Sequence, residues 1–207
     1  MKIRLTVTVV FGVVFGFLLG TALCVYAATA LETVKAPIDQ IVTILQDPQY
    51  QDGAKQDEQD AQLWPIIHQI FDFTEVSKRA LARNWRKFTP EQRKAFTNAF
   101  TDLLGNSYLD KMHGGEYKNV SVVFLDEKKL SEVKCQVNSK IISRDQELPV
   151  SYNLKLKENG WRIYDVKVEG VSLIKNYRLQ FNKNLKTKSP ADLIKQIEEK
   201  VAQQDKQ

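Results

Sequence analysis

Apolar residues recur at intervals of three and four along the first half of the chain, which is the spacing of one face of a helix. The first such stretch covers residues 31 to 51, and Pro37 within it marks a first turn or a kink. Shorter helical groups follow at residues 63 to 70 and 73 to 85. Residues 51 to 62 are polar and lack this periodicity, so a loop is predicted there. The apolar positions of the first stretch are Leu31, Val34, Ile38, Ile41, Val42 and Leu45.

Helix starts are marked by side chains that can satisfy free backbone N–H groups. Asp72 or Thr74 is placed to cap the helix of residues 73 to 85. Residues 89 to 92 read Thr-Pro-Glu-Gln, which is a capping box with proline at the first helical position. The helix that they open is predicted to end before Gly114-Gly115. Its apolar face consists of Phe96, Ala99, Phe100, Leu103, Leu104 and Tyr108.

From Tyr117 onward the apolar period changes to two, as in a strand with one buried face. Four strands are predicted, and Asn159-Gly160 forms the turn between the third and the fourth. The strands are expected to pair antiparallel, with one polar and one apolar face. The alternating apolar positions are Val120, Val122, Phe124, Val133, Cys135, Val137, Val150, Tyr152, Leu154, Leu156, Tyr164, Val166 and Val168.

Helical spacing returns at the end of the chain. One helix is predicted to begin near Val171 and another at Ser189-Pro190. The order is thus helices, strands and again helices, which predicts an α+β fold. In this fold, helices cover one face of a curved four-stranded antiparallel sheet. The apolar positions of the last two helices are Leu173, Tyr177, Phe181, Leu193, Ile194, Ile197 and Val201.

The N-terminus has the layout of a secretory signal peptide. Lys2 and Arg4 precede an uncharged apolar run at residues 5 to 23, and small residues follow. Cleavage after Ala27 is favoured, and cleavage after Ala30 is an alternative. The run also has the length of a membrane anchor, so an uncleaved segment is a third possibility.

Cleavage would also change the charge and the cysteine count. The formal net charge is +5, and loss of Lys2 and Arg4 lowers it to +3. A mild positive charge suits an anionic headgroup or membrane surface, but no basic stripe indicates nucleic acid. Lipidation of Cys24 is not favoured, because Leu23 stands where a small residue is expected.

The remaining residues, 28 to 207, suffice for one domain. The helical part is expected at about 31–113, the sheet at about 117–168 and the C-terminal helices at about 170–205. Only Cys135 remains in this part, so no internal disulfide can form. The fold must therefore rest on its hydrophobic core.

Catalytic and metal-binding chemistry has few candidates. His68 and His113 lie on different predicted helices, and no metal-ligand spacing or cofactor motif is present, so neither metal nor cofactor is expected. Each histidine is assigned a surface or packing role. Cys135 falls on the apolar phase of its strand, which predicts a buried, inert thiol. An enzyme of this fold would have to use Tyr152 and Asp165.

Three charged residues near the fourth strand allow more than one interpretation. Asp165 and Glu169 could form a carboxylate pair, but a salt bridge or a cap for the following helix is favoured. Arg178 could approach a phosphate, or it could pair with Glu169 or Asp165. The residues alone leave these alternatives open.

Two motifs carry a family resemblance. Residues 161 to 173 read Trp-x-x-Tyr-Asp-Val-x-x-Glu-Gly-Val-Ser-Leu, and residues 176 to 181 read Asn-Tyr-Arg-x-x-Phe. Upstream, residues 71 to 77 read Phe-Asp-Phe-Thr-Glu-Val-Ser, and the pattern continues through Trp85 to Tyr108. In this order and separation, the motifs resemble the MlaC family of periplasmic phospholipid carriers, also known as toluene-tolerance auxiliary proteins.

The resemblance implies a cone-like fold with an internal apolar cavity between sheet and helices. Periodicity alone favours a solid core, because the same residues would line a cavity or fill it. With the resemblance, the acyl chains are expected to contact a set of apolar side chains, and Arg178 is expected near the headgroup. The expected lining residues are Val137, Ile141, Val150, Tyr152, Leu154, Val166, Val168, Leu173, Tyr177 and Phe181.

The resemblance also implies partners. A soluble periplasmic carrier of this kind passes phospholipid between an outer-membrane lipoprotein complex and an inner-membrane ABC transporter with a lipid-channel subunit, and thereby serves outer-membrane lipid asymmetry. Transport direction stays open. The rival interpretations are an enzyme acting on a small apolar substrate and a membrane-tethered adaptor that binds no lipid.

Overall fold

The computed structural model describes residues 28–50, 54–113, 119–143 and 146–204. The predicted signal peptide, residues 1–27, lies outside the described residues. Within the described ranges, no helix combines the length and the apolar character needed to cross a membrane.

Helices occupy the first half of the chain, as predicted, but several of their boundaries differ. The first helix ends at Gln46 rather than near residue 51. The second helix begins at Gln56, so the loop prediction is wrong for residues 56–62. This polar stretch is held as a helix because Gln59 is buried and its Nε2 donates to the carbonyl of Ile44 at 3.0 Å. The third helix ends at Leu81 because Ala82 has a φ of 49°, and a 3-10 turn carries Trp85. The elements are α1 (Ala30–Gln46), η1 (Pro48–Tyr50), α2 (Gln56–Ile70), α3 (Phe73–Leu81), η2 (Ala82–Lys87) and α4 (Pro90–His113).

The sheet is antiparallel throughout and has five strands rather than the four predicted. Strands follow one another in the order β1-β2-β3-β4-β5. The additional strand β5 contains only Val171 and Ser172, too few residues to show an alternating pattern. The next helix therefore begins at Leu173 rather than near Val171. The elements are β1 (Val120–Ser131), β2 (Lys134–Ser143), β3 (Gln146–Lys157), β4 (Gly160–Val168), β5 (Val171–Ser172), α5 (Leu173–Asn184) and α6 (Pro190–Gln204).

Side-chain caps fix several helix starts. The predicted box at α4 is confirmed, because Thr89 Oγ1 accepts from Gln92 N at 3.2 Å and Gln92 Oε1 accepts from Thr89 N at 3.1 Å. Asp72 caps α3 by accepting from the N–H of Glu75 at 2.9 Å, so Asp72 rather than Thr74 is the cap. Such caps satisfy N–H groups that the first helical turn leaves free.

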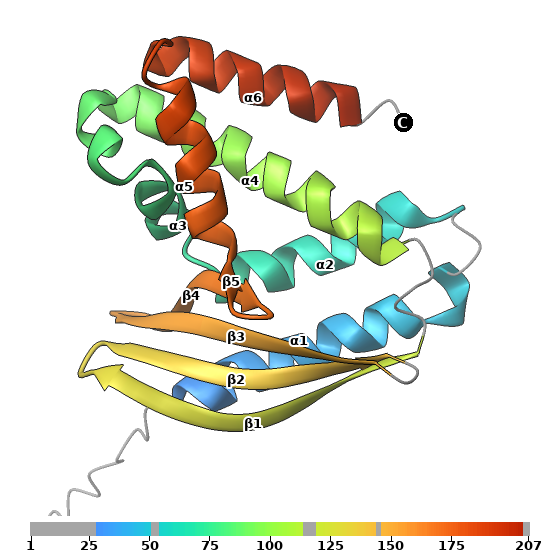
Figure 1. Cartoon of the computed structure of the whole chain (residues 1–207). Coiled ribbons are helices and arrows are strands. Elements are labelled where there is room, and N and C mark those ends of the chain that lie inside the picture. Colours follow the sequence, from blue (N-terminus) through green and yellow to red (C-terminus); the bar gives the residue numbers. More distant parts are fainter. Residues whose placement is uncertain (1–27, 51–53, 114–118, 144–145, 205–207) are drawn as a thin grey trace, which may run out of the picture.

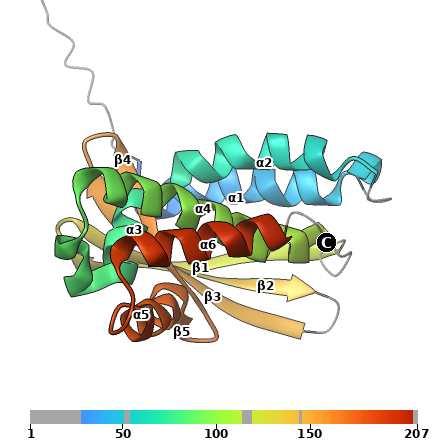
Figure 2. The same cartoon turned by 90° about the horizontal axis from the view of Figure 1, so that it is seen from above.

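The elements form two parts (Figure 1). Helix α1 runs across one face of the sheet, and α2 lies beside α1 in the view from above (Figure 2). Helices α3 to α6 stack beyond the β4 side of the sheet, with α4 and α6 in contact along their length. Helix α5 contacts β4 and so joins the two parts.

Two hydrophobic cores correspond to these parts. The sheet-side core is mostly aliphatic and consists of Ala30, Val34, Ile38, Ile70, Cys135, Val137, Val150, Tyr152, Leu154 and Ile163.

The helical core is rich in aromatic residues whose rings meet edge to face. Phe100 lies 4.9 Å from Tyr177 and 5.1 Å from Phe181 between ring centroids, and Phe96 lies 5.3 Å from Phe181. These contacts, which we call the ring lattice, join α4 to α5 and add to the energy of burial. The helical core consists of Val76, Ala80, Leu81, Phe88, Phe96, Ala99, Phe100, Leu103, Leu104, Ile174, Tyr177, Phe181, Leu193, Ile194 and Ile197.

Candidate functional site

The apolar residues predicted from the sequence to contact lipid fall into both cores. Ile141 and Val166 pack at the margin of the sheet-side core, and Leu173 packs against the helical core. Val168 is 39% exposed and belongs to neither core, because it pairs with Val171 beside the turn that ends β4. The fully packed members are Val137, Val150, Tyr152 and Leu154 in the sheet-side core, and Tyr177 and Phe181 in the helical core.

The two cores meet at the joint between α2 and α3. Phe71 packs against both cores at once. Its backbone forms an isolated parallel bridge with Ile163 of β4, and the N–H of Asp72 donates to the carbonyl of Ile163 at 2.9 Å. We call this boundary the seam.

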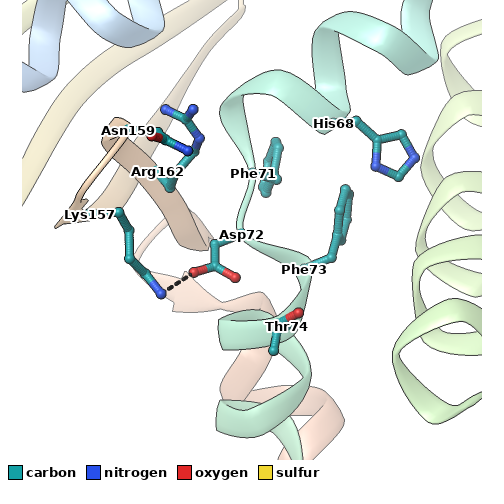
Figure 3. A pocket seen from close by; sticks show the side chains of 8 residues that line it. All are labelled: His68, Phe71, Asp72, Phe73, Thr74, Lys157, Asn159 and Arg162. Atoms are coloured by element: carbon teal, nitrogen blue, oxygen red, sulfur yellow. Dashed lines mark ion pairs between the residues drawn. The ribbon is translucent and has the colours of Figure 1, made fainter. Parts of the chain in front are cut away.

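A cavity of about 360 Å³ opens at the seam (Figure 3). One wall comes from the hairpin that joins β3 to β4, and the other comes from the end of α2 and the start of α3. None of the residues predicted to contact lipid lines this cavity. Its lining residues are His68, Phe71, Asp72, Phe73, Thr74, Lys157, Asn159 and Arg162.

The hairpin wall of the cavity is charged. Lys157 Nζ pairs with Asp72 Oδ2 at 2.7 Å. Burial by itself would raise the pKa of Asp72, but the hydrogen bond from Lys157, the N–H of Glu75 and the nearby lysine charges together lower it. The same hydrogen bond to Asp72 raises the pKa of Lys157. Arg162 Nη1 donates to the carbonyl of Trp161 at 2.9 Å, and no carboxylate of the described residues pairs with its guanidinium.

The opposite wall is aromatic. The rings of Phe71 and Phe73 stack, with centroids 5.6 Å apart and an interplanar angle of 18°. His68 lies 5.1 Å from Phe73 and 5.3 Å from Trp64, so it extends the same row of rings. His68 therefore has a packing role, as the sequence favoured, and the side chain of His113 lies outside the described residues. The cavity thus offers cations on one side and apolar rings on the other.

Arg178 lies elsewhere, between α3 and α5. Its Nε donates to the carbonyl of Arg79 at 2.9 Å, and it is half-buried. No ion pair with either Glu169 or Asp165 occurs in the part of the chain that the structure describes. The guanidinium of Arg79 in turn covers the ring of Tyr164 at 3.7 Å. Arg178 therefore connects helices and does not line the cavity.

The predicted capping role of Asp165 is confirmed. Its Oδ1 accepts from the N–H of Ile174 at 3.2 Å, and its Oδ2 accepts from the hydroxyl of Ser172 at 2.7 Å. Ser172 is itself the N-cap of α5 and accepts from the N–H of Lys175 at 3.0 Å. Glu169 has a φ of 51° in the turn and is exposed. The motif of residues 161 to 173 thus fixes the start of α5 to the sheet.

The remaining chemical candidates do not form a catalytic group. Cys135 is buried, and burial together with nearby Glu127 raises its pKa to about 11. Burial likewise raises the pKa of Tyr152. Tyr152 pairs with Val166 and Asn153 pairs with Asp165, so Tyr152 and Asp165 project from opposite faces of the sheet. Among the described residues, no three His, Cys, Asp or Glu side chains gather as a metal site.

Comparison with known proteins identifies a protein family and similar solved structures. The sequence profile of the family described as "MlaC protein" matches residues 35–199. A solved phospholipid-binding protein from Ralstonia solanacearum, in complex with a phospholipid, superposes with a TM-score of 0.78 at 23% sequence identity. The match covers 86% of this chain and 99% of that chain, which shows a shared fold. No curated protein sequence matches significantly.

Proposed function

This chain belongs to the MlaC protein family, and from that premise we propose that it binds phospholipid by burying the acyl chains between its sheet-side and helical cores. The proposal is carried by the shared fold with a protein solved in complex with a phospholipid. It is supported by the division of the predicted lining residues between two cores that meet at an open seam.

The volume of the cavity implies that the cores separate when lipid binds. The two chains of a phospholipid carry about thirty methylene-type groups. If each takes the ~30 Å³ of a water molecule in the liquid, the chains need roughly 900 Å³. The cavity at the seam has about 360 Å³. This cavity alone is therefore too small for the chains, and we infer that the two cores move apart to give additional space lined by side chains such as Val166 and Leu173.

A shuttle follows from the energetics of the acyl chains. At ~0.8 kcal/mol per methylene, exposing both chains to water would cost on the order of 25 kcal/mol. This cost excludes free diffusion of a phospholipid across an aqueous compartment. A carrier must therefore bury the acyl chains nearly as well as a membrane does. We place the protein in the periplasm, where it would exchange lipid with an outer-membrane lipoprotein complex and an inner-membrane ABC transporter with a lipid-channel subunit.

A binding role is favoured over catalysis by the positions of the two residues on which an enzyme would depend. Tyr152 faces the sheet-side core, whereas Asp165 is occupied in capping on the opposite face. The two groups cannot act on one substrate. The adaptor alternative differs from ours in a single observable, the presence of bound lipid.

Lipid analysis of the purified protein tests the proposal. The protein is expressed in bacteria, purified without detergent, and examined by native mass spectrometry and by lipid extraction. We expect a phospholipid bound in about equimolar amount, and transfer of labelled phospholipid between donor and acceptor vesicles after delipidation. Lipid-free protein that also takes up no labelled phospholipid would contradict the proposal and favour an adaptor.

Two matched variants locate the chains. Val166→Trp places a large ring at the margin of the sheet-side core, and Val123→Trp places the same ring on β1 at a position 43% exposed. We expect Val166→Trp to lose most of its bound lipid and Val123→Trp to keep it, with folded circular dichroism spectra for both. Full lipid occupancy in Val166→Trp would place the acyl chains elsewhere.

A further inference from the structure

The cavity at the seam has the composition of an anion site. Lys157 and Arg162 approach it from the two strands of one hairpin, and Asn159 in the turn between them adds an amide (Figure 3). Arg162 is half-buried and donates from Nη1 to the carbonyl of Trp161, and within the described ranges its other guanidinium N–H groups stay available. A partly buried guanidinium with free donors is suited to an oxyanion, which it can hold by two parallel hydrogen bonds.

The charges of the lining residues add to a single positive charge. Lys157 is neutralised by Asp72, with which it pairs at 2.7 Å, whereas Arg162 has no carboxylate partner among the described residues. The first turn of α3, at Phe73 and Thr74, adds a weak positive potential to the same cavity. The site therefore complements an anion of one negative charge, such as a phosphodiester.

The aromatic wall indicates what is attached to the anion. Phe71 and Phe73 form a stacked apolar surface beside the cations, and Phe71 continues into both cores. A free phosphate ion would leave this surface without a partner. A phosphodiester carrying an acyl glycerol would place its charge on the hairpin and its chains along Phe71 into the seam.

We propose that the phosphodiester of the bound lipid occupies this cavity, which we call the subsite. Arg162 makes the principal contact with the phosphodiester, and Lys157 is positioned beside it by the ion pair with Asp72. The inference rests on the proposed function and makes it more specific, because it gives phosphate-bearing lipids an advantage over lipids of the same chains without phosphate. The cavity of about 360 Å³ is large enough for the phosphate and glycerol region alone.

The test compares two fluorescent lipids with identical chains, a phosphatidylglycerol and a diacylglycerol. Arg162→Ala should weaken binding of the phosphatidylglycerol by roughly tenfold or more and leave the diacylglycerol unchanged. Arg86→Ala, which removes the same charge from an exposed position on η2, should change neither. Equal responses of Arg162→Ala and Arg86→Ala would overturn the subsite.

A second variant should change affinity in the opposite direction. Asp72→Asn removes the negative charge that neutralises Lys157 but keeps an oxygen able to cap α3. Its affinity for the phosphatidylglycerol should rise severalfold, and this gain should disappear in high salt. No gain in low salt would count against the subsite.

Controls separate the subsite from the proposed function and from a free-anion site. Wild-type protein that binds neither lipid would overturn the function itself, whereas binding of both lipids with equal affinity would overturn only the subsite. Inorganic phosphate and glycerophosphoglycerol, which share the anion but lack chains, should compete only at far higher concentration than the lipid. Competition by inorganic phosphate at the lipid's own concentration would show a free-phosphate site instead.

Discussion

Asp72 shows how much one residue contributes at the centre of this molecule. Its carboxylate caps α3 and pairs with Lys157 of the hairpin, and its N–H bonds to β4. The start of α3 is thereby fixed to the hairpin of β3 and β4, which is distant from it in sequence. Replacement of Asp72 should therefore lower the stability of the fold and also change the cavity.

Substitutions of Asp72 separate the cap from the ion pair. Asp72→Ala should lower the free energy of unfolding by about 1 to 2 kcal/mol near neutral pH, because it removes both interactions. Asp72→Asn keeps a capping oxygen and should cost about 0.5 kcal/mol, since Lys157 is 41% exposed and the pair is screened by solvent. Urea unfolding of the three proteins measures these differences.

The pH dependence of the same proteins follows from the lowered pKa of Asp72. A carboxylate with a lower pKa in the folded state stabilises the fold above its unfolded pKa of about 3.9, and this contribution is lost as pH falls through the folded pKa. The advantage of wild type over Asp72→Asn should therefore be constant from about pH 5 to 8 and shrink at more acidic pH. An advantage that persisted unchanged in acid would show that the ion pair does not stabilise the fold.

At this scale, the sequence identified local partners and missed distant ones. The caps Asp72 and Thr89 were predictable because donor and acceptor lie within three residues. The ion pair of Lys157 with Asp72 was not predictable, because no local sequence pattern relates residues that only the tertiary fold brings together. Arg162 was missed for the same reason, although its place two residues after the Asn159-Gly160 turn could have marked it as a hairpin residue at the edge of the sheet.

At the scale of the elements, the errors of prediction have physical causes. Helix α2 extends through a polar stretch because a buried glutamine, Gln59, bonds to the end of α1, and such a contact leaves no periodic signal. Helix α3 is shortened by the positive φ of Ala82, a conformation unusual for alanine. Long amphipathic elements such as α4 were predictable because packing and local preference agree there.

Contact between α2 and α4 gives a prediction for Gly105. A Cβ built at Gly105 would overlap Cζ2 of Trp64, so the Trp64 ring can lie against the backbone of α4 only because glycine is present. Gly105→Ala should therefore destabilise the protein by about 1 to 3 kcal/mol, although alanine normally favours a helix. The midpoint of urea unfolding measures the change.

A second substitution checks the cause. Trp64→Phe removes the overlapping ring atoms, so the double variant Gly105→Ala/Trp64→Phe should regain part of the stability lost by Gly105→Ala alone. If Gly105→Ala alone raised the midpoint, α2 and α4 would not be packed as they are here.

At the scale of the whole molecule, the apolar pattern was correct about most buried residues but did not report the space between them. It was wrong at four positions, Tyr108, Val133, Leu156 and Val168, whose side chains are exposed. Val137 and Tyr177 were predicted as parts of one lining, yet they belong to separate cores. Periodicity reports which face of an element avoids water, but it does not distinguish one core from two or a cavity from a filled interior. The seam depends on how the helical part is placed against the sheet, which no local pattern encodes.

Separation of the cores predicts a local change in hydrogen exchange. The amide of Asp72 is held by the carbonyl of Ile163 across the seam, so its exchange should become faster when phospholipid holds the cores apart. Amides around Phe96 and Phe100 in α4 should keep their protection, because the helical core stays intact. Exchange measured by NMR or mass spectrometry on lipid-free and lipid-loaded protein checks both. Bound lipid with no change at Asp72 would mean that the chains enter by another route.

The ring lattice has a consequence for the order of events during biosynthesis. Phe96 and Phe100 come from the middle of the chain, and their partners Tyr177 and Phe181 come from near its end. The helical core cannot close until almost the whole polypeptide has emerged, because contacts of such long sequence separation form late. A nascent chain built this way therefore has no closed helical core until translation is nearly finished, and its helices α3 and α4 wait for a partner that is made last.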